Sequence, residues 1–191
     1  MAGRPRASSQ RMLEEAASEL FLEQGYSKTT IEQIARRAGV SRNTFFNYFP
    51  AKADLLWVEL DASLAALTDA LSNAPADVDP LASVETALAI TADGFTPDRA
   101  PLVLTQWQVM GVDEELKAAG LARALAHADA IERHLAGRGV DPLRARAIAL
   151  AAIGAAAAAV GRWAADGPER RPLGDYLTNV VHPVLQGFDI G

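Results

Sequence analysis

The segment R-A-G-V-S-R-N-T-F-F-N-Y-F-P (37–50) decides how the first part of the chain folds. Gly39 can supply the left-handed backbone conformation that a tight turn between two helices needs. Val40 can fill the angle between these helices, and Ser41 can cap the second one. The pattern I-x-x-I-A stands before the turn, and a short aromatic segment follows it. This order predicts a helix-turn-helix, whose second helix enters the major groove of DNA.

Helical patterns flank the turn, whereas alternating strand patterns are nearly absent from the chain. Ser8 or Ser9 can cap a first helix, and Gly25 lies just beyond the end of that helix. Thr30 and Gln33 form a possible capping box for the second helix. These signals predict a compact group of three helices at the start of the chain.

The rest of the chain is predicted to be helices separated by turn-forming residues. Pro50 ends the third helix, and a long fourth helix follows, with a turn at 73–80. Further helices are predicted over about 81–94, 99–110, 113–136, 142–165 and 173–187. The fold class is therefore all-α with about nine helices: a three-helix head (1–52), the fourth helix (52–74) as a connector, and a larger body (75–191).

Residues 45–49 hold four of the twelve aromatic residues of the chain. On a helical wheel with about 100° per residue, Phe45, Phe46 and Phe49 share one arc. The opposite arc carries side chains that can form hydrogen bonds, namely Asn43, Thr44, Asn47 and Tyr48. We therefore expect the three phenylalanines to pack against the first two helices and the polar arc to face DNA.

The polar arc is suited to contacts with DNA. Asparagine can form two hydrogen bonds to adenine, and threonine or tyrosine can bind a phosphate or touch a thymine methyl group. Arg42 lies on the core side of the wheel, but its long side chain can reach a base or a phosphate. The starts of the second and fourth helices can hold phosphates, although the alternative for the asparagines is ordinary solvation. The predicted DNA contacts are Lys28, Thr29, Thr30, Ser41, Arg42, Asn43, Thr44, Asn47, Tyr48 and Lys52.

The charge distribution favours DNA contact by the head alone. The chain has a net charge of −6, which argues against a general nucleic-acid binder. Residues 1–57 nevertheless hold eight Lys and Arg against six Asp and Glu, a balance of +2. The remaining residues hold ten basic against eighteen acidic side chains, a balance of −8. A mildly basic head on an acidic body suggests that only the head meets a polyanion, although ordinary solvated faces can differ by as much.

Composition also limits the compartment and the chemistry. The chain has no cysteine, which excludes disulfides, cysteine-ligated zinc and thiol catalysis. The basic N-terminus leads into a mixed helix, so we expect no signal peptide. The most apolar run, 147–160, is about 14 residues long, whereas a membrane span takes about 20. We expect a cytoplasmic, nucleoid-associated protein without a membrane partner, a metal or another cofactor.

The segment 25–56 resembles the DNA-binding domain of the TetR family of bacterial transcriptional regulators. The matching elements are Gly25-Tyr26, Thr29-Thr30-Ile31, Ile34-Ala35, Ala38-Gly39-Val40-Ser41, Thr44, Phe46, Tyr48-Phe49, Lys52 and Leu55. Phe46 stands where the family often has tyrosine, which removes a hydroxyl group. Asn43 replaces a more usual small residue, and Pro50-Ala51 precedes the lysine where a polar pair is common.

The resemblance implies an all-α homodimer that binds a palindromic operator on double-stranded DNA and often represses transcription. A small molecule entering the body moves the fourth helix, so that the two heads no longer fit the operator. By resemblance, the helices near 142–165 and 173–187 pair with those of a second copy, although packing within one chain is the alternative. Their candidate contact residues are Gly154, Ala157, Ala158, Gly161 and Ala165 in the first helix and Tyr176, Leu177, Val180, Val181, Val184 and Leu185 in the second.

The ligand of the body is less clearly marked. The segment Q-W-Q-V-M (106–110) and a later helix that ends in R-W-A-A-D-G look similar to regulators that sense acyl-coenzyme A or lipid-like molecules. Ordinary core packing is the alternative role for every candidate. The candidate ligand-binding residues are Phe95, Leu104, Trp107, Met110 and Trp163.

A helical enzyme or an interaction bundle without DNA binding is the competing class. His127 and His134 lie seven residues apart on one helical face, which could suggest a metal site. No carboxylate stands three residues before any histidine, so the Glu-x-x-His unit of di-metal bundles is missing. The segment G-R-G-V-D-P (137–142) follows a helix, which favours a turn over a nucleotide-binding loop. We therefore predict no catalytic residues and no enzyme activity.

Overall fold

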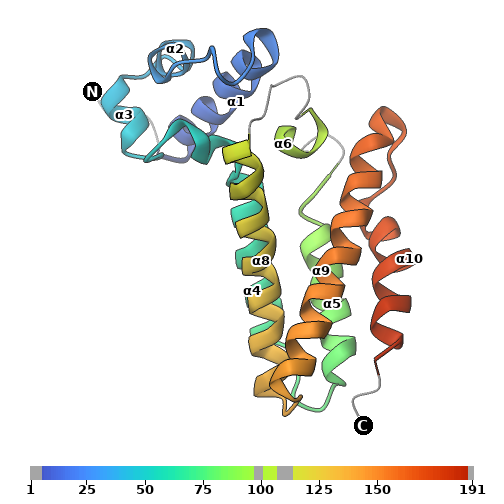
Figure 1. The fold of residues 1–191 in the computed structure, drawn as a ribbon. Coiled ribbons are helices and arrows are strands. Elements are labelled where there is room, and N and C mark those ends of the chain that lie inside the picture. The colour runs from blue at the N-terminus through green and yellow to red at the C-terminus, as the bar shows by residue number, and fades with distance from the viewer. Residues whose placement is uncertain (1–5, 97–100, 107–113, 189–191) are drawn as a thin grey trace. The chain divides into compact units, whose positions relative to one another are not determined.

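The computed structural model describes residues 6–96, 101–106 and 114–188 (Figure 1). All regular structure within these ranges is helical, with nine α-helices and two short 3-10 helices. The structure divides into two compact units, of which the first holds Met1–Val58 with Gln106–Lys117. The second holds Glu59–Thr105 with Ala118–Gly191, so the turn at 73–80 lies inside the second unit. The prediction of an all-α fold is confirmed.

The first unit is built from α1 (Arg6–Gln24), α2 (Ile31–Arg37), α3 (Arg42–Phe46) and the 3-10 helix η1 (Lys52–Leu56). Helix α2 packs against both α1 and α3. The side chains that face inward are apolar and almost fully buried, and they include Leu13, Ala17, Phe21, Ile34, Ala35, Phe45 and Phe49. Helices α2 and α3, with seven and five residues, are too short to be stable alone, so burial of these side chains supplies most of their stability.

The turn between α2 and α3 has the geometry that its sequence predicts. Gly39 has a φ of 68°, in the left-handed region that favours glycine. The N–H groups of Gly39 and Val40 donate to the carbonyls of Arg36 (3.1 Å) and Ala35 (2.9 Å), which is the Schellman ending of a helix. The hydroxyl of Ser41 then accepts the N–H of Thr44 at 3.0 Å and caps α3.

Three boundaries differ from the sequence-based predictions. Helix α1 begins at Arg6, so Ser8 and Ser9 lie inside it and the expected cap is wrong. Helix α3 ends at Phe46 and does not continue to Pro50. The predicted fourth helix begins with the 3-10 turn η1, and the α-helix proper, α4 (Val58–Ser72), starts six residues after Lys52. Wheel arguments assume unbroken α-helix, so they fail beyond these ends.

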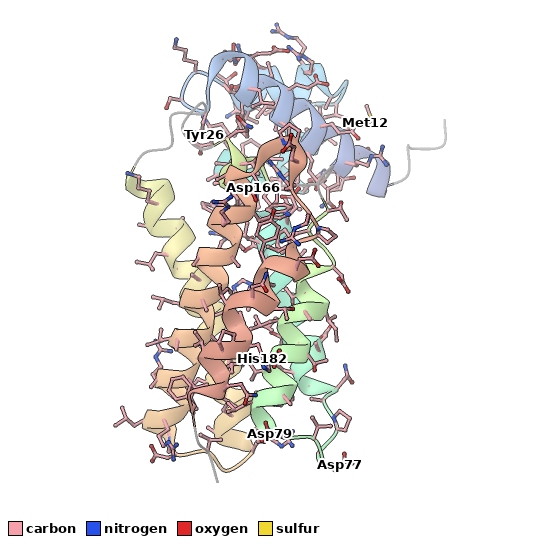
Figure 2. All side chains as sticks on the ribbon, turned by 90° about the vertical axis from the view of Figure 1, so that its right-hand side faces the viewer. Met12, Tyr26, Asp77, Asp79, Asp166 and His182 are labelled. Atoms are coloured by element: carbon pink, nitrogen blue, oxygen red, sulfur yellow. The ribbon has the colours of Figure 1, made fainter. Side chains whose placement is uncertain are left out.

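The second unit is a bundle of α4, α5 (Pro80–Ala92), α6 (Leu102–Thr105), most of α8 (Glu114–Gly137), α9 (Pro142–Ala165) and α10 (Leu173–Gln186), with the 3-10 helix η3 at Gly167–Glu169. Helices α9 and α10 lie side by side, and α10 also packs against α5 (Figure 1). Figure 2 shows Asp79 at the start of α5, where its carboxylate accepts the N–H groups of Leu81 and Ala82 at 2.9 Å. His182 on α10 contacts Glu85 on α5 at 2.9 Å.

Polar side chains inside this bundle find partners within it. The Nε2 atom of His127 lies 2.9 Å from the hydroxyl of Ser63, which joins α8 to α4. The Nε2 atom of His134 lies 2.7 Å from the hydroxyl of Ser83, which joins α8 to α5. Both histidines therefore serve helix packing. Within the part of the chain that the structure describes, no group of three potential metal ligands comes together.

The turn between α8 and α9 repeats the design of the turn between α2 and α3. Gly139 has a φ of 87°, and the N–H of Val140 donates to the carbonyl of Leu135 at 3.1 Å. Asp141 then caps α9 by accepting the N–H of Arg144 at 3.0 Å. Residues 137–142 therefore form the predicted turn.

Helix α9 spans the range predicted from the sequence, and much of its apolar surface is exposed. It has 24 residues, and its most apolar stretch has a mean hydropathy of 1.6 with 28% of that stretch buried. By length and composition alone this helix could cross a membrane, but a single such helix is weak evidence for a membrane span. Core helices of soluble proteins share this length and composition. Packing within the core of the chain does not account for the exposed apolar surface of α9.

Candidate nucleic-acid interface

Helix α3 is anchored by two of the three phenylalanines that were predicted to hold it. Phe45 and Phe49 are buried, with 0% and 5% of their surface exposed. Their ring centroids lie 5.7 Å apart, within the range of favourable aromatic packing. The burial of these two rings settles which side of α3 faces the rest of the first unit.

Phe46 does not belong to this anchor, so the prediction that all three rings are core is wrong. It is 43% exposed and shares the open side of α3 with Arg42, Asn43 and Asn47, which are exposed too. The buried side therefore lies around Phe45, rotated from the arc that the wheel indicated. The helical wheel placed the buried side midway between Phe45, Phe46 and Phe49. In the structure only Phe45 and Phe49 pack inward, and the chain leaves the α-helix after Phe46.

The other predicted contacts on α3 are less exposed than expected. Thr44 and Tyr48 are half-buried, at the border between the anchor and the open side. The hydroxyl of Thr44 lies 2.8 Å from that of Ser41, so both hydroxyls take part in the cap. Asn43 and Asn47 are exposed, and an amide can form two hydrogen bonds to adenine. Their role in binding DNA stays a prediction.

Arg42 lies on the open side and not on the core side of the helix. Its Nε atom forms an ion pair with Glu32 of α2 at 3.1 Å. Its guanidinium carbon lies 5.5 Å from the ring centroid of Phe46, in the range of cation–π contact. Arg42 is therefore held beside the exposed ring, and its contact with DNA stays a prediction.

Glu32 is the residue that the sequence analysis missed. An acidic side chain at a DNA interface is unfavourable unless it orients a cation, which is what its pairing with Arg42 does. Its position in the first turn of α2 was visible in the sequence. Its proximity to Arg42, ten residues away across the turn, depends on the angle between the helices and could not be read from spacing.

The start of α2 has the predicted capping box. Thr30 accepts the N–H of Gln33 at 3.2 Å, and the Gln33 side chain accepts the N–H of Thr30 at 2.8 Å. Thr30 and its neighbour Lys28 are exposed at this helix end. The positive end of a helix dipole and a lysine favour an anion there, so phosphate contact by these two residues remains a prediction.

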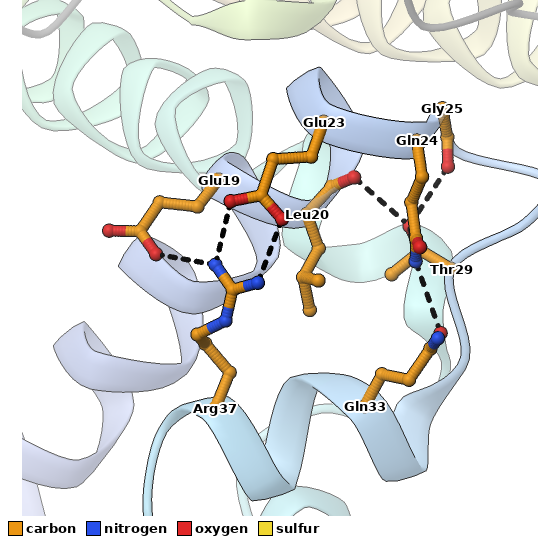
Figure 3. A network of polar contacts seen from close by, with 8 residues as sticks. All are labelled: Glu19, Leu20, Glu23, Gln24, Gly25, Thr29, Gln33 and Arg37. Carbon is orange, nitrogen blue, oxygen red and sulfur yellow. Dashed lines mark hydrogen bonds and ion pairs between the residues drawn. The ribbon is translucent and has the colours of Figure 1, made fainter.

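Thr29 has a different role from the predicted phosphate contact. It is only 1% exposed, and its hydroxyl donates to the carbonyl of Gly25 at 2.8 Å. The same oxygen lies 3.3 Å from the carbonyl of Leu20 and accepts the amide of Gln24 at 3.1 Å. These contacts tie the end of α1 to the segment before α2, so the hydroxyl is not available to DNA in this arrangement (Figure 3).

Helices α1 and α2 are further joined by polar contacts on their surface (Figure 3). Arg37 binds Glu23 at 2.7 Å and Glu19 at 3.0 Å. The hydrogen bond to Glu23, followed by that to Glu19, raises the pKa of Arg37 above its ordinary value. The amide of Gln24 also donates to the side chain of Gln33 at 3.1 Å. These contacts hold α2, and with it the turn to α3, in a fixed relation to α1.

Lys52 closes the first unit from the other end. Its ammonium donates to the carbonyls of Tyr26 (2.7 Å) and Thr29 (2.8 Å) and lies 4.0 Å from the centroid of the Tyr26 ring. Partial burial lowers the pKa of the Lys52 ammonium below its ordinary value. The predicted phosphate clamp is therefore engaged inside the protein, where it joins η1 to the loop between α1 and α2.

The arrangement matches two protein families over most of the chain. The family described as "Bacterial regulatory proteins, tetR family" matches residues 13–57, and the family described as "MftR C-terminal domain" matches residues 78–189. The chain belongs to the TetR family. It is a DNA-binding transcriptional regulator with a helix-turn-helix, as the sequence predicted.

Known members of the TetR family agree with this assignment. The Mycobacterium tuberculosis regulator MftR is 34% identical over 71 residues, which are 37% of this chain and 36% of that protein. The match therefore spans about a third of the length of this curated relative. The crystal structure of Thermus thermophilus FadR, a transcriptional repressor in complex with lauroyl-CoA, is 26% identical with a TM-score of 0.62 and covers 95% of this chain and 96% of its own. The crystal structure of native NalD from Pseudomonas aeruginosa is 25% identical, with a TM-score of 0.65. The match covers 96% of this chain and 98% of NalD.

The candidate ligand-binding residues of this TetR-family protein have different environments. Trp163 is fully buried, and its indole N–H donates to the carbonyl of Arg171 at 3.0 Å, so it is a core residue here. Phe95 is half-buried against the same core, and Leu104 in α6 is half-buried as well. Trp107 and Met110 lie outside the described residues. Phe95 and Leu104 are therefore partly exposed, and their role in ligand binding stays a prediction.

Replacing Thr29 with valine should destabilise the first unit without changing its apolar packing. Valine has the same shape but leaves a buried amide and two carbonyls without the hydroxyl, which costs about 1–3 kcal/mol. Urea denaturation should show this loss for Thr29→Val and little change for Thr29→Ser, which keeps the hydroxyl. A Thr29→Val protein as stable as Thr29→Ser, with weaker DNA binding alone, would instead assign the hydroxyl to a phosphate.

Proposed function

We propose that this TetR-family regulator is a homodimeric repressor of transcription in the cytoplasm. It binds a palindromic operator and leaves it when a hydrophobic or acyl-CoA-like effector binds to the body. The observation that carries the proposal is the open side of α3, where Arg42, Asn43 and Asn47 are exposed behind a rigid turn. Two amides and a guanidinium on one short helix can form the bidentate contacts that distinguish bases in the major groove.

The surface of α9 supports a dimer. All five small residues predicted to form one face are exposed, and a Cβ atom added to Gly154 or Gly161 would meet no atom within 4 Å. The face continues toward the start of the helix through Leu150, 42% exposed, and Leu143, 79% exposed. From Leu150 onward these residues recur at intervals of three or four, with Ala157 and Ala158 adjacent, which keeps them near one side of the helix. A second copy would cover this apolar stripe.

Helix α10 contributes to the proposed dimer less than the sequence suggested. Leu177, Val181 and Leu185 are buried within the core of the same chain, so they are not available to a partner. Tyr176 is half-buried, and its hydroxyl donates to Asp166 at 2.7 Å. Val180 and Val184 are half-buried, so they and the small-residue side of α9 are the predicted contact surfaces that remain.

A dimer accounts for operator symmetry. A two-fold interface uses the same surface of both copies, and two identical heads then bind two inverted half-sites. The chain continues directly from η1 into α4, so a shift of α4 is a means of altering the separation of the heads. Differential binding of an effector to the two arrangements would drive this shift.

The nature of the effector is inferred by analogy. The similar Thermus thermophilus FadR is described as a repressor in complex with lauroyl-CoA. Phe95 and Leu104 offer half-buried apolar surface in the body that an acyl chain could contact. A helical bundle or an enzyme without DNA binding is disfavoured because the relatives are named as transcriptional regulators.

Loss of the two amides of α3 should abolish sequence-specific DNA binding. Each bidentate contact to a base contributes about 1–3 kcal/mol, so Asn43→Ala with Asn47→Ala should weaken binding by at least tenfold. The measurement is fluorescence anisotropy at fixed salt with duplexes that the full-length protein selects from a random library. Asn179→Ala on α10 makes the same chemical change in the body and should leave affinity intact. Unchanged binding by the double variant would sink the groove-side assignment.

Introducing arginine on the small-residue face should separate the dimer. Ala158→Arg keeps a good helix former but places bulk and charge where a second copy would pack. Light scattering should show the wild-type mass at twice 20.2 kDa and the variant at 20.2 kDa. Ala65→Arg on the exposed side of α4 is the matched control and should remain dimeric. Equal masses for Ala158→Arg and the wild type would contradict this interface.

Lauroyl-CoA should stabilise the protein and release it from DNA. A ligand at about 100 times its dissociation constant adds about 2.7 kcal/mol to the stability of the native state. A thermal-shift titration should therefore raise the melting temperature, and the same concentrations should reverse the anisotropy signal of the bound duplex. Coenzyme A without the acyl chain should do neither. Equal effects of coenzyme A and lauroyl-CoA would contradict recognition of the acyl chain.

A further inference from the structure

Phe46 is an apolar side chain on a polar surface, and the core of the first unit does not account for it. Its 43% exposure contrasts with the burial of Phe45 on the same helix and of Phe49 just beyond the end of that helix. Its exposed neighbours on the open side of α3 are Arg42, Asn43 and Asn47. A single exposed apolar residue needs no explanation in general, but this one lies among the residues proposed to meet bases.

The ring of Phe46 is held in a defined position. The ring of Phe45 packs against it at a centroid distance of 5.5 Å and an interplanar angle of 84°. The guanidinium of Arg42 lies 5.5 Å from its centroid, and Glu32 holds that guanidinium in turn. A ring fixed on two sides loses little conformational freedom when a third surface covers it, so it is suited to making a specific contact.

We propose that Phe46 reads the C5-methyl group of a thymine in the major groove, an inference that rests on the proposed operator binding. Thymine carries the methyl group that gives this groove its apolar feature, and phenylalanine is one of the side chains that contact it. Phenylalanine has no hydroxyl, so it cannot hold a phosphate by a hydrogen bond as tyrosine could at this position. Phe46 thus selects a base by shape and apolar contact.

The surroundings of Phe46 favour DNA over another protein as its partner. The adjacent guanidinium and amides complement the acceptor-rich edge of the major groove. The surface suited to a second copy of the chain is the small-residue stripe on α9, on a different helix from Phe46. The exposed ring and the exposed amides are therefore parts of one reading surface.

Replacing thymine with uracil tests this contact because it removes the methyl group and keeps base pairing. The probes are duplexes selected by the full-length protein from a random library, then resynthesised with uracil at one symmetric pair of thymine positions at a time. Loss of one buried methyl group should weaken binding about fourfold, so loss of a symmetric pair should weaken it about fifteenfold. We expect this ratio of thymine to uracil affinity at one symmetric pair of positions. In Phe46→Ala this ratio should fall to about one, while the slope of affinity against salt stays unchanged because no charge is lost.

Two further variants make the outcome specific. Leu22→Ala removes another exposed apolar side chain of the same unit, 45% exposed on α1, and should keep the wild-type ratio. Phe46→Leu keeps an apolar side chain and should retain part of the ratio. Equal binding of thymine and uracil duplexes by the wild type, or an undiminished ratio in Phe46→Ala, overturns the role of Phe46 and leaves operator binding standing. Selection of no duplex at all overturns both proposals.

Discussion

The left-handed conformation of Gly39 is the constraint on which the DNA-binding unit depends. It ends α2 through the paired hydrogen bonds of Gly39 and Val40 and directs the chain so that Ser41 can cap α3. No atom would crowd a side chain at position 39, so the requirement for glycine is conformational and not steric. Any other residue would strain this backbone by about 1 kcal/mol or more. The side of α3 that Phe45 buries then determines which residues remain open.

The same reasoning shows how much of the fold could be predicted from sequence. Glycine stops and caps depend on interactions within a few residues, so the turns at Gly39 and Gly139 and the cap at Thr30 followed from spacing alone. The rotation of α3 did not, because Phe45, Phe46 and Phe49 are equivalent in composition and differ only in what surrounds them. Neither did the partners of Lys52, whose ammonium reaches carbonyls more than twenty residues away. Local signals were sufficient for elements, whereas side-chain roles depended on tertiary contacts.

In the body, the sequence pattern predicted the exposed side of α9 but not the burial of the apolar side of α10. The small residues of α9 were expected to share one face, and they are exposed together, although alanine-rich sequence gives no strong indication of where a helix packs. The apolar residues of α10 were expected beside them but serve the internal core, where Leu177 and Val181 meet α5 and α9. The large apolar side chains Leu177, Val181 and Leu185 of α10 are buried in this core, whereas the small residues on one side of α9 remain at the surface, where they permit close approach of another helix.

The low net positive charge of the head makes uncharged contacts to bases important for the proposed DNA binding. Its balance is only +2 over residues 1–57, and four of its described cations have partners within the protein: Arg11 with Glu15, Arg37 with two glutamates, Arg42 with Glu32 and Lys52 with backbone carbonyls. Sequence-independent attraction to DNA scales with the number of phosphates neutralised, so this head has a small share of it. Discrimination must therefore come from contacts whose strength depends on the base. In the proposed interface, amides and an exposed aromatic ring would supply such contacts without adding attraction for every duplex, which would raise the ratio of specific to non-specific binding.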